Sequence, residues 1–325
     1  MNNRILGNTG IKVSEIGFGA WGIGGLTKGR SSYGPTDDEE SKRALRTALE
    51  EGITFYDTSD MYGYGHSEEL IGEVFESLRD KVVIATKVGF LEHLGPQDFS
   101  PQNVRASLEK SLKRLRTDYV DVYQLHSPVI EELIKSPENL ETFNTLQEEG
   151  KIRAVGISVA SPTDGVRVVN VFPSVRVIQT NLNLIDQRAI ECGLLDLAQQ
   201  NEVGIIARTP LCFGFLADER PQGFHPRDHR TSRPLEQLQK WQSAPDLFMS
   251  LNKEKPRTFA QFALQFCLAQ KAVATVIPGM TKTLRVMENA AASTLVPLSP
   301  EELQEIQRIY KSHTFFDHNA RQKAL

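Results

Sequence analysis

The sequence contains few cysteines, no long apolar run and no strong excess of either charge. Its cysteines lie far apart and include no C-x-x-C pair, which argues against a disulfide framework or a zinc site and favours a reducing cytoplasm. No apolar stretch has the length of a signal peptide core or a membrane helix. Lys and Arg total 37 against 41 Asp and Glu, so the chain lacks the basic excess typical of nucleic-acid binding. We therefore expect a cytoplasmic protein that binds neither nucleic acid nor membrane.

The chain does contain a repeated alternation of short apolar runs and longer amphipathic stretches. Hydrophobic residues make up 40% of its 325 residues, and no Pro/Gly/Ser-rich linker divides it, which predicts a single domain over residues 1–325. Near-continuous apolar runs are expected for parallel strands that are buried on both faces. The predicted strands are Ile16–Ala20, Ile53–Tyr56, Val82–Thr86, Val120–Gln124, Ala154–Ile157, Val175–Gln179, Gly204–Ala207 and Thr275–Ile277.

Helical periodicity fills the intervals between these strands. The predicted helices are Asp37–Glu51, Ser67–Leu78, Asn103–Leu115, Ile130–Glu149, Pro162–Asn170, Arg188–Gln200, Thr258–Gln270, Leu284–Ala292 and Ser299–Lys311. Strands that alternate with helices in this way predict a (β/α)8 TIM barrel, here with an N-terminal β-hairpin; a doubly wound open sheet is the alternative. Residues 212–256 follow the seventh strand and are rich in proline and charge. They predict a long loop that acts as a lid over the mouth of the barrel.

A glycine motif near the N-terminus is misleading. Residues 17–22 satisfy G-x-G-x-x-G, the pattern of a dinucleotide-binding Rossmann fold. That site requires the motif to open a helix directly, whereas here further glycines follow. We interpret the motif as a loop at the end of the first strand, where a ligand can approach the backbone.

Four polar residues mark the ends of predicted strands or the loop that follows one. Asp57, Lys87 and His126 each end an apolar run, and Tyr62 lies five residues after Asp57. Barrel enzymes place their catalytic side chains at these strand ends. Each residue alone has a structural interpretation, such as a helix cap or a core histidine. A lysine ending an apolar strand is harder to explain, because a buried ammonium needs a partner, and Asp57 is the nearest candidate.

Together the four residues match the needs of carbonyl reduction, which requires a hydride donor and a proton donor. Tyr62 is a weak acid, and a nearby ammonium such as Lys87 favours its phenolate and makes it a better acid. Asp57 can hold Lys87, and His126 can orient the carbonyl through a hydrogen bond. This chemistry needs no metal ion.

Several segments carry a resemblance to a known family. They include Phe55-Tyr-Asp-Thr-Ser-Asp-Met-Tyr-Gly63, Gly65-His-Ser-Glu68, Ala85-Thr-Lys87, Asp118–His126 and Lys151–Ser158. The chain resembles the aldo-keto reductase superfamily, and matching segments cover nearly all of it. The resemblance implies a (β/α)8 fold, a nicotinamide cofactor, and Tyr62 as general acid supported by Lys87, Asp57 and His126.

The resemblance also implies contacts to the nicotinamide, with two departures. Ser158 and Gln179 match residues that bind the carboxamide, but Val159 replaces the usual Asn. Arg208 occupies the place where many members stack an aromatic ring on the nicotinamide. A planar guanidinium can also stack on a ring, so we keep Arg208 as a cofactor contact; the alternative is a salt-bridged residue at the rim.

Further cofactor contacts follow from matching segments at the other strand ends. Arg285 falls where some NADPH-preferring members place an arginine against the 2′-phosphate, with Lys282 close by, which favours NADPH over NADH; an ordinary surface pair of Arg285 with Glu288 is the alternative. The remaining predicted cofactor-binding residues are Gly19, Ala20, Trp21, Asp57, Pro210, Leu211, Phe213, Gly214, Phe215, Pro278, Gly279, Glu288 and Asn289.

The sequence thus predicts an enzyme that reduces an aldehyde or ketone to an alcohol with NADPH. One alternative is a cofactor-binding, redox-sensing regulatory subunit of the same fold, although the intact set of four residues argues against a purely binding role. A second alternative is an alcohol dehydrogenase that acts on sugar-type or steroid-type substrates. The partner is expected to be a small carbonyl compound, whose identity depends on loops around the mouth.

Overall fold

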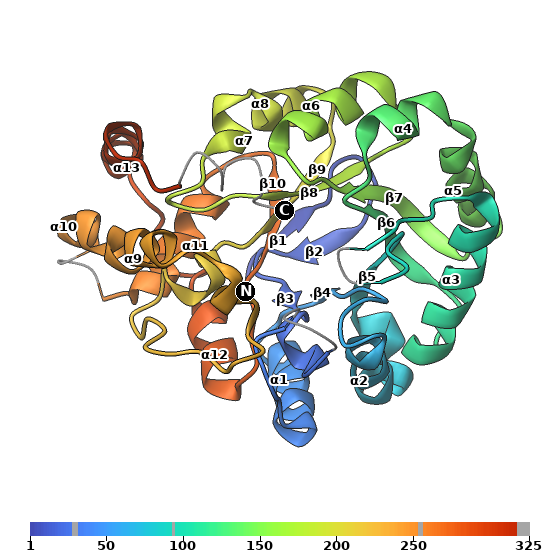
Figure 1. Ribbon diagram of the computed structural model, residues 1–325, viewed down its shortest axis with the longest axis horizontal. Coiled ribbons are helices and arrows are strands. Elements are labelled where there is room, and N and C mark those ends of the chain that lie inside the picture. Colours follow the sequence, from blue (N-terminus) through green and yellow to red (C-terminus); the bar gives the residue numbers. More distant parts are fainter. Residues whose placement is uncertain (28–31, 93–94, 253–255, 317–325) are drawn as a thin grey trace.

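The computed structural model describes residues 1–27, 32–92, 95–252 and 256–316, and it confirms the predicted (β/α)8 barrel. Within these residues, parallel strands form one sheet in the order β10-β9-β8-β7-β6-β5-β4-β3, surrounded by helices (Figure 1). The strands are β3 (Phe18–Gly19), β4 (Phe55–Asp57), β5 (Val83–Val88), β6 (Val120–His126), β7 (Ile152–Ser158), β8 (Val177–Asn181), β9 (Gly204–Arg208) and β10 (Val273–Ile277).

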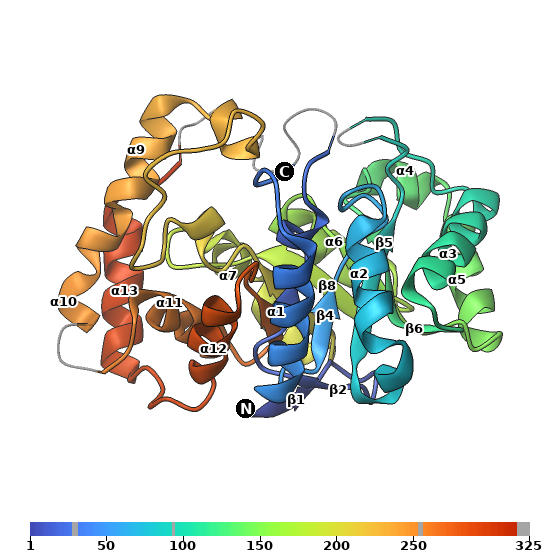
Figure 2. The ribbon, with the colours of Figure 1, turned by 90° about the horizontal axis from the view of Figure 1, so that it is seen from below.

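The barrel closes between its first and last strands. Parallel bridges join Ile16 to Val276 and Gly19 to Gly279. The predicted N-terminal hairpin consists of β1 (Asn3–Ile5) and β2 (Lys12–Ser14), which pair antiparallel and lie at the end of the barrel away from α9 (Figure 2). Leu6 beside the hairpin shares an inner apolar cluster with residues of the barrel strands. The hairpin therefore plugs the amino-terminal end, and the opposite mouth is left for ligands.

The surrounding helices begin and end close to the predicted residues, for local reasons that the sequence contains. Ser100 caps its helix by accepting a hydrogen bond from the Asn103 amide, and Ser299 does the same in a reciprocal capping box with Glu302. The helices are α1 (Asp38–Glu50), α2 (His66–Phe75), α3 (Pro101–Leu115), α6 (Pro162–Val171), α11 (Phe259–Leu268), α12 (Thr283–Ala291) and α13 (Pro300–Ser312). None of the described helices is long and apolar enough to cross a bilayer.

Two predicted helices are each broken in two. The stretch predicted as Ile130–Glu149 forms α4 (Ile130–Lys135) and α5 (Glu138–Glu148), because Pro137 excludes its predecessor from helical geometry. The stretch predicted as Arg188–Gln200 forms α7 (Arg188–Glu191) and α8 (Leu194–Gln200), which are separated by Gly193 at a φ of 75°. Hydrophobic periodicity continues across both breaks, and this is why it hides them.

The segment after β9 was predicted to be a long loop, but the structure shows that part of it is helical. It contains α9 (Leu235–Ser243) and α10 (Met249–Asn252), and α9 stands at the edge of the molecule opposite the hairpin (Figure 2). Trp241 anchors α9, because its buried ring packs against Phe213, Phe215 and Phe316. The segment is therefore a folded cover whose aromatic residues join the main apolar core.

Candidate active site

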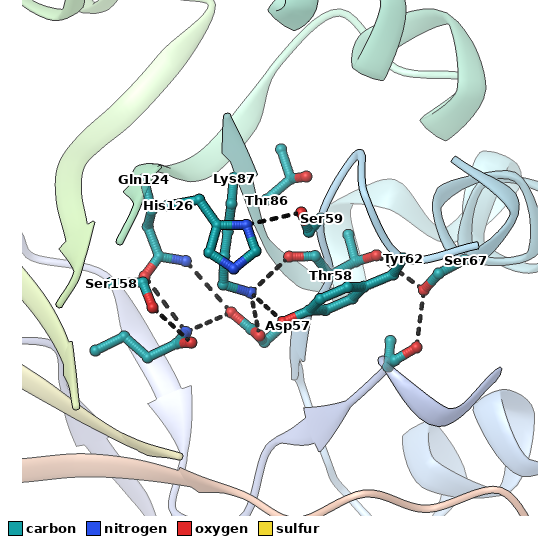
Figure 3. Close-up of polar contacts among 12 residues, drawn as sticks. Asp57, Thr58, Ser59, Tyr62, Ser67, Thr86, Lys87, Gln124, His126 and Ser158 are labelled. Carbon is teal, nitrogen blue, oxygen red and sulfur yellow. Dashed lines mark hydrogen bonds and ion pairs between the residues drawn. The ribbon is translucent and has the colours of Figure 1, made fainter. Parts of the chain in front are cut away.

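Lys87, whose side chain is fully buried, forms the centre of a polar cluster at the carboxyl end of β5. Its ammonium Nζ donates to Asp57 Oδ1 at 2.6 Å, to the Thr58 carbonyl at 2.8 Å and to the Tyr62 hydroxyl at 3.1 Å. Figure 3 shows Lys87 between Asp57 and Tyr62. An ammonium has three protons, so these three acceptors satisfy it completely. Burial alone would lower the pKa of Lys87, but the Asp57 carboxylate and the hydrogen bonds outweigh burial and raise it, so Lys87 stays charged.

The second oxygen of Asp57 is held by amides from two other strands. Gln179 Nε2 donates to Asp57 Oδ2 at 2.7 Å, and Gln124 Nε2 donates to the same oxygen at 3.3 Å. The sequence reasoning missed Gln124. The signal was present, because Gln124 precedes His126 by two residues on β6, and such residues face the same side of a strand.

Tyr62 reaches the cluster from the loop between β4 and α2. The loop turns sharply at Gly63, which has a φ of 66° and packs against Gly24. Burial raises the pKa of Tyr62 above its ordinary value, while the Lys87 ammonium opposes that rise. Because Lys87 donates to the phenolic oxygen, the proton of that hydroxyl points toward another acceptor.

His126 ends β6 beside Tyr62. The two rings lie edge to face with centroids 6.2 Å apart, and the ring of Phe90 approaches His126 at 5.0 Å. Its Nδ1 lies 3.3 Å from the Ser59 hydroxyl, which the sequence reasoning did not single out. The structure thus brings Asp57, Tyr62, Lys87 and His126 together.

The predicted nicotinamide contacts extend this cluster across neighbouring strands. Ser158 and Gln179 are register partners on β7 and β8, and Ser158 Oγ donates to Gln179 Oε1 at 3.3 Å. The side chain of Val159, which replaces an amide of the family, is buried. Its carbonyl accepts a hydrogen bond from Arg208 Nη2 at 3.0 Å. Arg208 therefore lies next to the predicted carboxamide site.

Arg208 itself has an unusual environment for a guanidinium. It forms no ion pair with any described residue, and its Nε is buried without a hydrogen-bond partner among them. Burial lowers the pKa of Arg208. The alternative that Arg208 is a salt-bridged rim residue is therefore not supported, because no described carboxylate pairs with it. A buried donor without a partner is costly, which indicates that this side chain is arranged for a ligand.

The segment after Arg208 is conformationally strained. Thr209, Cys212 and Phe213 all have positive φ values, and Gly214 continues the run at 94°. Non-glycine residues with positive φ concentrate at ligand sites, where the surrounding structure compensates the strain. The backbone of this run belongs to the segment predicted to hold the pyrophosphate, together with Pro210, Leu211 and Phe215.

The last βα unit carries the predicted adenosine-phosphate residues. Arg285 on α12 pairs with Glu288 at 2.7 Å and also with Glu219 from the cover. The surface pair considered from the sequence is therefore present. Lys282 is exposed just before α12. Asn289 is buried, and its Oδ1 has no hydrogen-bond partner among the described residues.

The glycine loop after β3 forms one wall of the mouth, as the interpretation of residues 17–22 predicted. Gly19 lies against Pro278 and Gly279, and the Ala20 amide donates to the Asp57 carbonyl at 2.9 Å. Trp21 projects from this loop, with its ring centroid 6.4 Å from that of Tyr62.

Two residues of the mouth were not predicted as site residues. Tyr33 and His229 both stack near Trp21, with ring centroids 5.0 Å and 4.6 Å from it. His229 comes from the cover, so the cover rests on the first loop across the mouth. No group of three or more potential metal ligands occurs in the described part of the chain.

These features fit a nicotinamide dinucleotide better than a metal or a covalent group. The orphaned atoms Arg208 Nε and Asn289 Oδ1 lie on the strands and helices where the nicotinamide and adenosine ends are predicted. The strained run at 212–214 lies in sequence between them. Buried polar atoms without a partner among the described residues are candidates for contacts with a ligand.

Comparisons with known proteins agree with this geometry. A family model described as the Aldo/keto reductase family matches residues 15–311. The uncharacterized oxidoreductase YqkF of Bacillus subtilis is 32% identical, with 96% of this chain and 99% of the relative covered. L-galactose dehydrogenase of Arabidopsis thaliana is 31% identical, with 94% and 93% covered. The solved structure of aldo-keto reductase AKR11C1 from Bacillus halodurans, in its holo form, is 30% identical with a TM-score of 0.79 and covers 99% of each chain.

Proposed function

The chain belongs to the aldo/keto reductase family, and we propose that it reduces an aldehyde or ketone to an alcohol with a hydride from NADPH. The observation that carries the proposal is the threefold coordination of the buried Lys87 ammonium by Asp57, Thr58 and Tyr62. This arrangement commits a buried cation to one side of a tyrosine hydroxyl. It serves proton transfer to an oxygen that becomes negative during the reaction.

In the proposed reaction, Tyr62 is the proton donor. Lys87 donates to the phenolic oxygen, so the hydroxyl proton is directed to the substrate oxygen, and the ammonium stabilises the phenolate that remains. Burial raises the pKa of Tyr62, which keeps the proton in place until a strongly basic alkoxide develops. Asp57 balances the charge of Lys87, and His126 donates a hydrogen bond that orients the carbonyl.

The cofactor site supports a nicotinamide dinucleotide. When bound, NADPH supplies the hydride. Ser158, Gln179 and Arg208 would hold its nicotinamide end, and Asn289 its adenosine end. Arg285 and Lys282 favour the 2′-phosphate of NADPH, since Arg forms strong charge-assisted hydrogen bonds with phosphate. Arg285 would have to exchange its present carboxylate partners, Glu219 and Glu288, for that phosphate.

A cofactor titration followed by a panel of carbonyl compounds tests the proposal. We expect fluorescence to show tighter binding of NADPH than of NADH, and activated aldehydes to accelerate NADPH oxidation. The Tyr62→Phe variant should bind NADPH normally but lose nearly all turnover. Tight cofactor binding without turnover on any carbonyl would instead support the redox-sensing regulatory subunit, and full activity in Tyr62→Phe would exclude Tyr62 as the acid.

Oxidation of an alcohol is the second candidate, because one relative is named L-galactose dehydrogenase. The same four residues would act in reverse, with the Tyr62 phenolate accepting the proton. Supplying NADP⁺ with sugar alcohols and aldoses distinguishes the two directions. A kcat/KM that is higher for oxidation than for any carbonyl would favour the dehydrogenase.

A further inference from the structure

The Ser59 hydroxyl lies behind His126 and is fully buried. It accepts a hydrogen bond from the Met61 amide at 3.1 Å, and it contacts Asp60 Oδ1 at 3.1 Å and His126 Nδ1 at 3.3 Å. Figure 3 shows the contact between Ser59 and His126 on the side of the ring away from Ser158. None of these contacts is needed to explain the cluster around Lys87.

The Ser59 hydroxyl has a single proton, so it can donate to Asp60 or to His126 but not to both. A hydroxyl has one proton to donate and two lone pairs with which to accept. The Met61 amide occupies one lone pair. Asp60 and His126 must therefore share the remaining lone pair and the single proton, so that only one of them accepts the proton at a time.

Two hydrogen-bond arrangements satisfy the Ser59 hydroxyl between Asp60 and His126. When Asp60 is ionised, Ser59 donates to Asp60 and accepts from a protonated His126 Nδ1; a neutral ring then has no proton on Nε2. When Asp60 is protonated, it donates to Ser59, and Ser59 donates to an unprotonated Nδ1. The neutral ring then carries its proton on Nε2 and can donate that proton in a hydrogen bond.

We propose that Ser59 and Asp60 are positioning residues that set which ring nitrogen of His126 carries the proton, and thereby whether a neutral His126 can donate to the substrate carbonyl. The proposal rests on the role proposed for His126 in carbonyl reduction. It adds that two residues of the loop after β4 regulate the ability of His126 to donate a hydrogen bond.

The surroundings of Asp60 place the exchange between these arrangements near neutral pH. Burial, and then the negative charge of Glu68 on α2, raise the pKa of Asp60 to about 7, while Ser59 and then Arg114 on α3 oppose the rise. From β6, Tyr123 and His126 are the titratable groups that face this region. Glu68 is itself engaged by Thr86 at 2.5 Å and by Arg114 at 2.6 Å.

The proton balance of the exchange is simple. Protonation of Asp60 takes up one proton from solvent. The neutral His126 ring gains none overall, because it loses a proton at Nδ1 and gains one at Nε2 by exchange with water. No oxidant, reductant or further reactant takes part.

Nitrogen NMR of the whole protein tests the proposal without any turnover. The ¹⁵N shifts of a histidine ring distinguish the two neutral tautomers from the imidazolium, and a His126→Gln spectrum assigns the ring. In the wild-type protein we expect the Nε2-protonated tautomer at low pH to give way to the Nδ1-protonated tautomer as the pH rises through about 7. A neutral ring with one unchanged tautomer across this range would overturn the proposal.

Single-turnover rates of NADPH oxidation provide the second readout. We expect the wild-type rate to fall about tenfold between about pH 6 and pH 8, following one titration near 7. Asp60→Asn cannot titrate, so its rate should stay level, whereas the exposed Asp80→Asn serves as a matched control and should follow the wild-type curve. If Asp60→Asn kept the wild-type pH dependence, the proposed control of His126 by Asp60 through Ser59 would be refuted.

Ser59 substitutions separate a positioning role from a merely structural one. Ser59→Ala removes the shared hydroxyl and should uncouple the His126 tautomer from pH, and Ser59→Thr should restore the coupling. If Ser59→Ala kept the coupling, Asp60 would not act through Ser59. If wild type and all variants lacked turnover while the tautomer of His126 still changed with pH, the proposed function would be refuted. The coupling of Asp60 to His126 through Ser59 would still hold.

Discussion

Two arcs of the barrel mouth differ in how their polar atoms are satisfied. In the catalytic arc, at the ends of β4 to β6, Lys87 donates to three acceptors and both oxygens of Asp57 accept hydrogen bonds. In the nucleotide arc, from β9 to α12, Arg208 Nε and Asn289 Oδ1 are buried without partners among the described residues. The Lys87–Asp57 pair of the first arc is therefore satisfied without a ligand, whereas these two atoms of the second arc are not.

The difference reflects two kinds of function, charge stabilisation in a reaction and recognition of a ligand. Groups that stabilise charge in a reaction act best when they are fixed in advance, because they need no reorganisation as the charge develops. Groups that recognise a ligand can remain unsatisfied until the ligand supplies their partners, and this unsatisfied state lowers the stability of the free protein. Substitutions in the two arcs should therefore affect stability in opposite directions.

The largest effect is expected from Lys87→Met in the catalytic arc. It removes the stabilisation of the Tyr62 phenolate, so turnover should fall about a thousandfold. It also leaves Asp57 as a buried charge without its cation, which should lower the free energy of unfolding by about 3–5 kcal/mol. Steady-state kinetics and urea unfolding measure the two effects. Lys81→Met, at an exposed lysine, is the control and should change neither.

Arg208→Leu makes the corresponding change in the nucleotide arc, with a smaller effect on function. The affinity for NADPH should fall about tenfold to a hundredfold, because a contact to the nicotinamide end is lost. The free protein should not be destabilised, since the guanidinium has no ion-pair partner among the described residues and its buried Nε has no hydrogen-bond partner there. A drop in stability as large as that of Lys87→Met would abolish the distinction between the arcs. The exposed Arg308→Leu serves as control.

The sequence indicated how the catalytic arc is assembled more directly than it did for the nucleotide arc. Strand ends mark where side chains converge, so Asp57, Lys87 and His126 could be grouped before any coordinates were known. Gln124 was missed although it shares a strand face with His126, and Ser59 was missed because its importance lies in which atoms its hydroxyl faces. The aromatic contact of His229 with Trp21 depends on how the cover folds back, and no local pattern encodes that path.

The same contrast explains the errors in the fold. Alternating apolar runs predicted every strand of the barrel, since burial on both faces imposes that pattern. The breaks at Pro137 and Gly193 were missed because apolar spacing persists through them. The helix α9 was missed because proline and charge around it outweighed the single anchor Trp241.

Glu219→Gln sharpens the comparison at the rim of the nucleotide arc. The carboxylate of Glu219 pairs with Arg285, and under the proposed function it would compete with the 2′-phosphate of NADPH for the guanidinium. Its removal should tighten NADPH binding about threefold, because an exposed pair contributes little, and should leave NADH binding unchanged. Titrations of both cofactors at low salt measure the effect. Glu305→Gln breaks a comparable pair on α13 and should alter neither affinity; equal gains for both cofactors would contradict a 2′-phosphate at Arg285.

The last effect is expected on the stability of the loop that carries Ser59 and Asp60, and it depends on pH. The pKa of Asp60 is raised from 3.8 to about 7, so the folded state binds this proton more tightly than the unfolded chain does. That contribution is fully present below about pH 4 and is lost as the pH rises to about 7. Asp60→Asn should therefore gain stability over wild type across this window, by about 1–2 kcal/mol after allowance for solvent screening. Urea unfolding at about pH 5 and pH 8 measures the gain, which should grow as the pH rises. If the difference in free energy of unfolding between Asp60→Asn and wild type shrank instead, Asp60 would be held as a carboxylate by its partners, as Asp57 is.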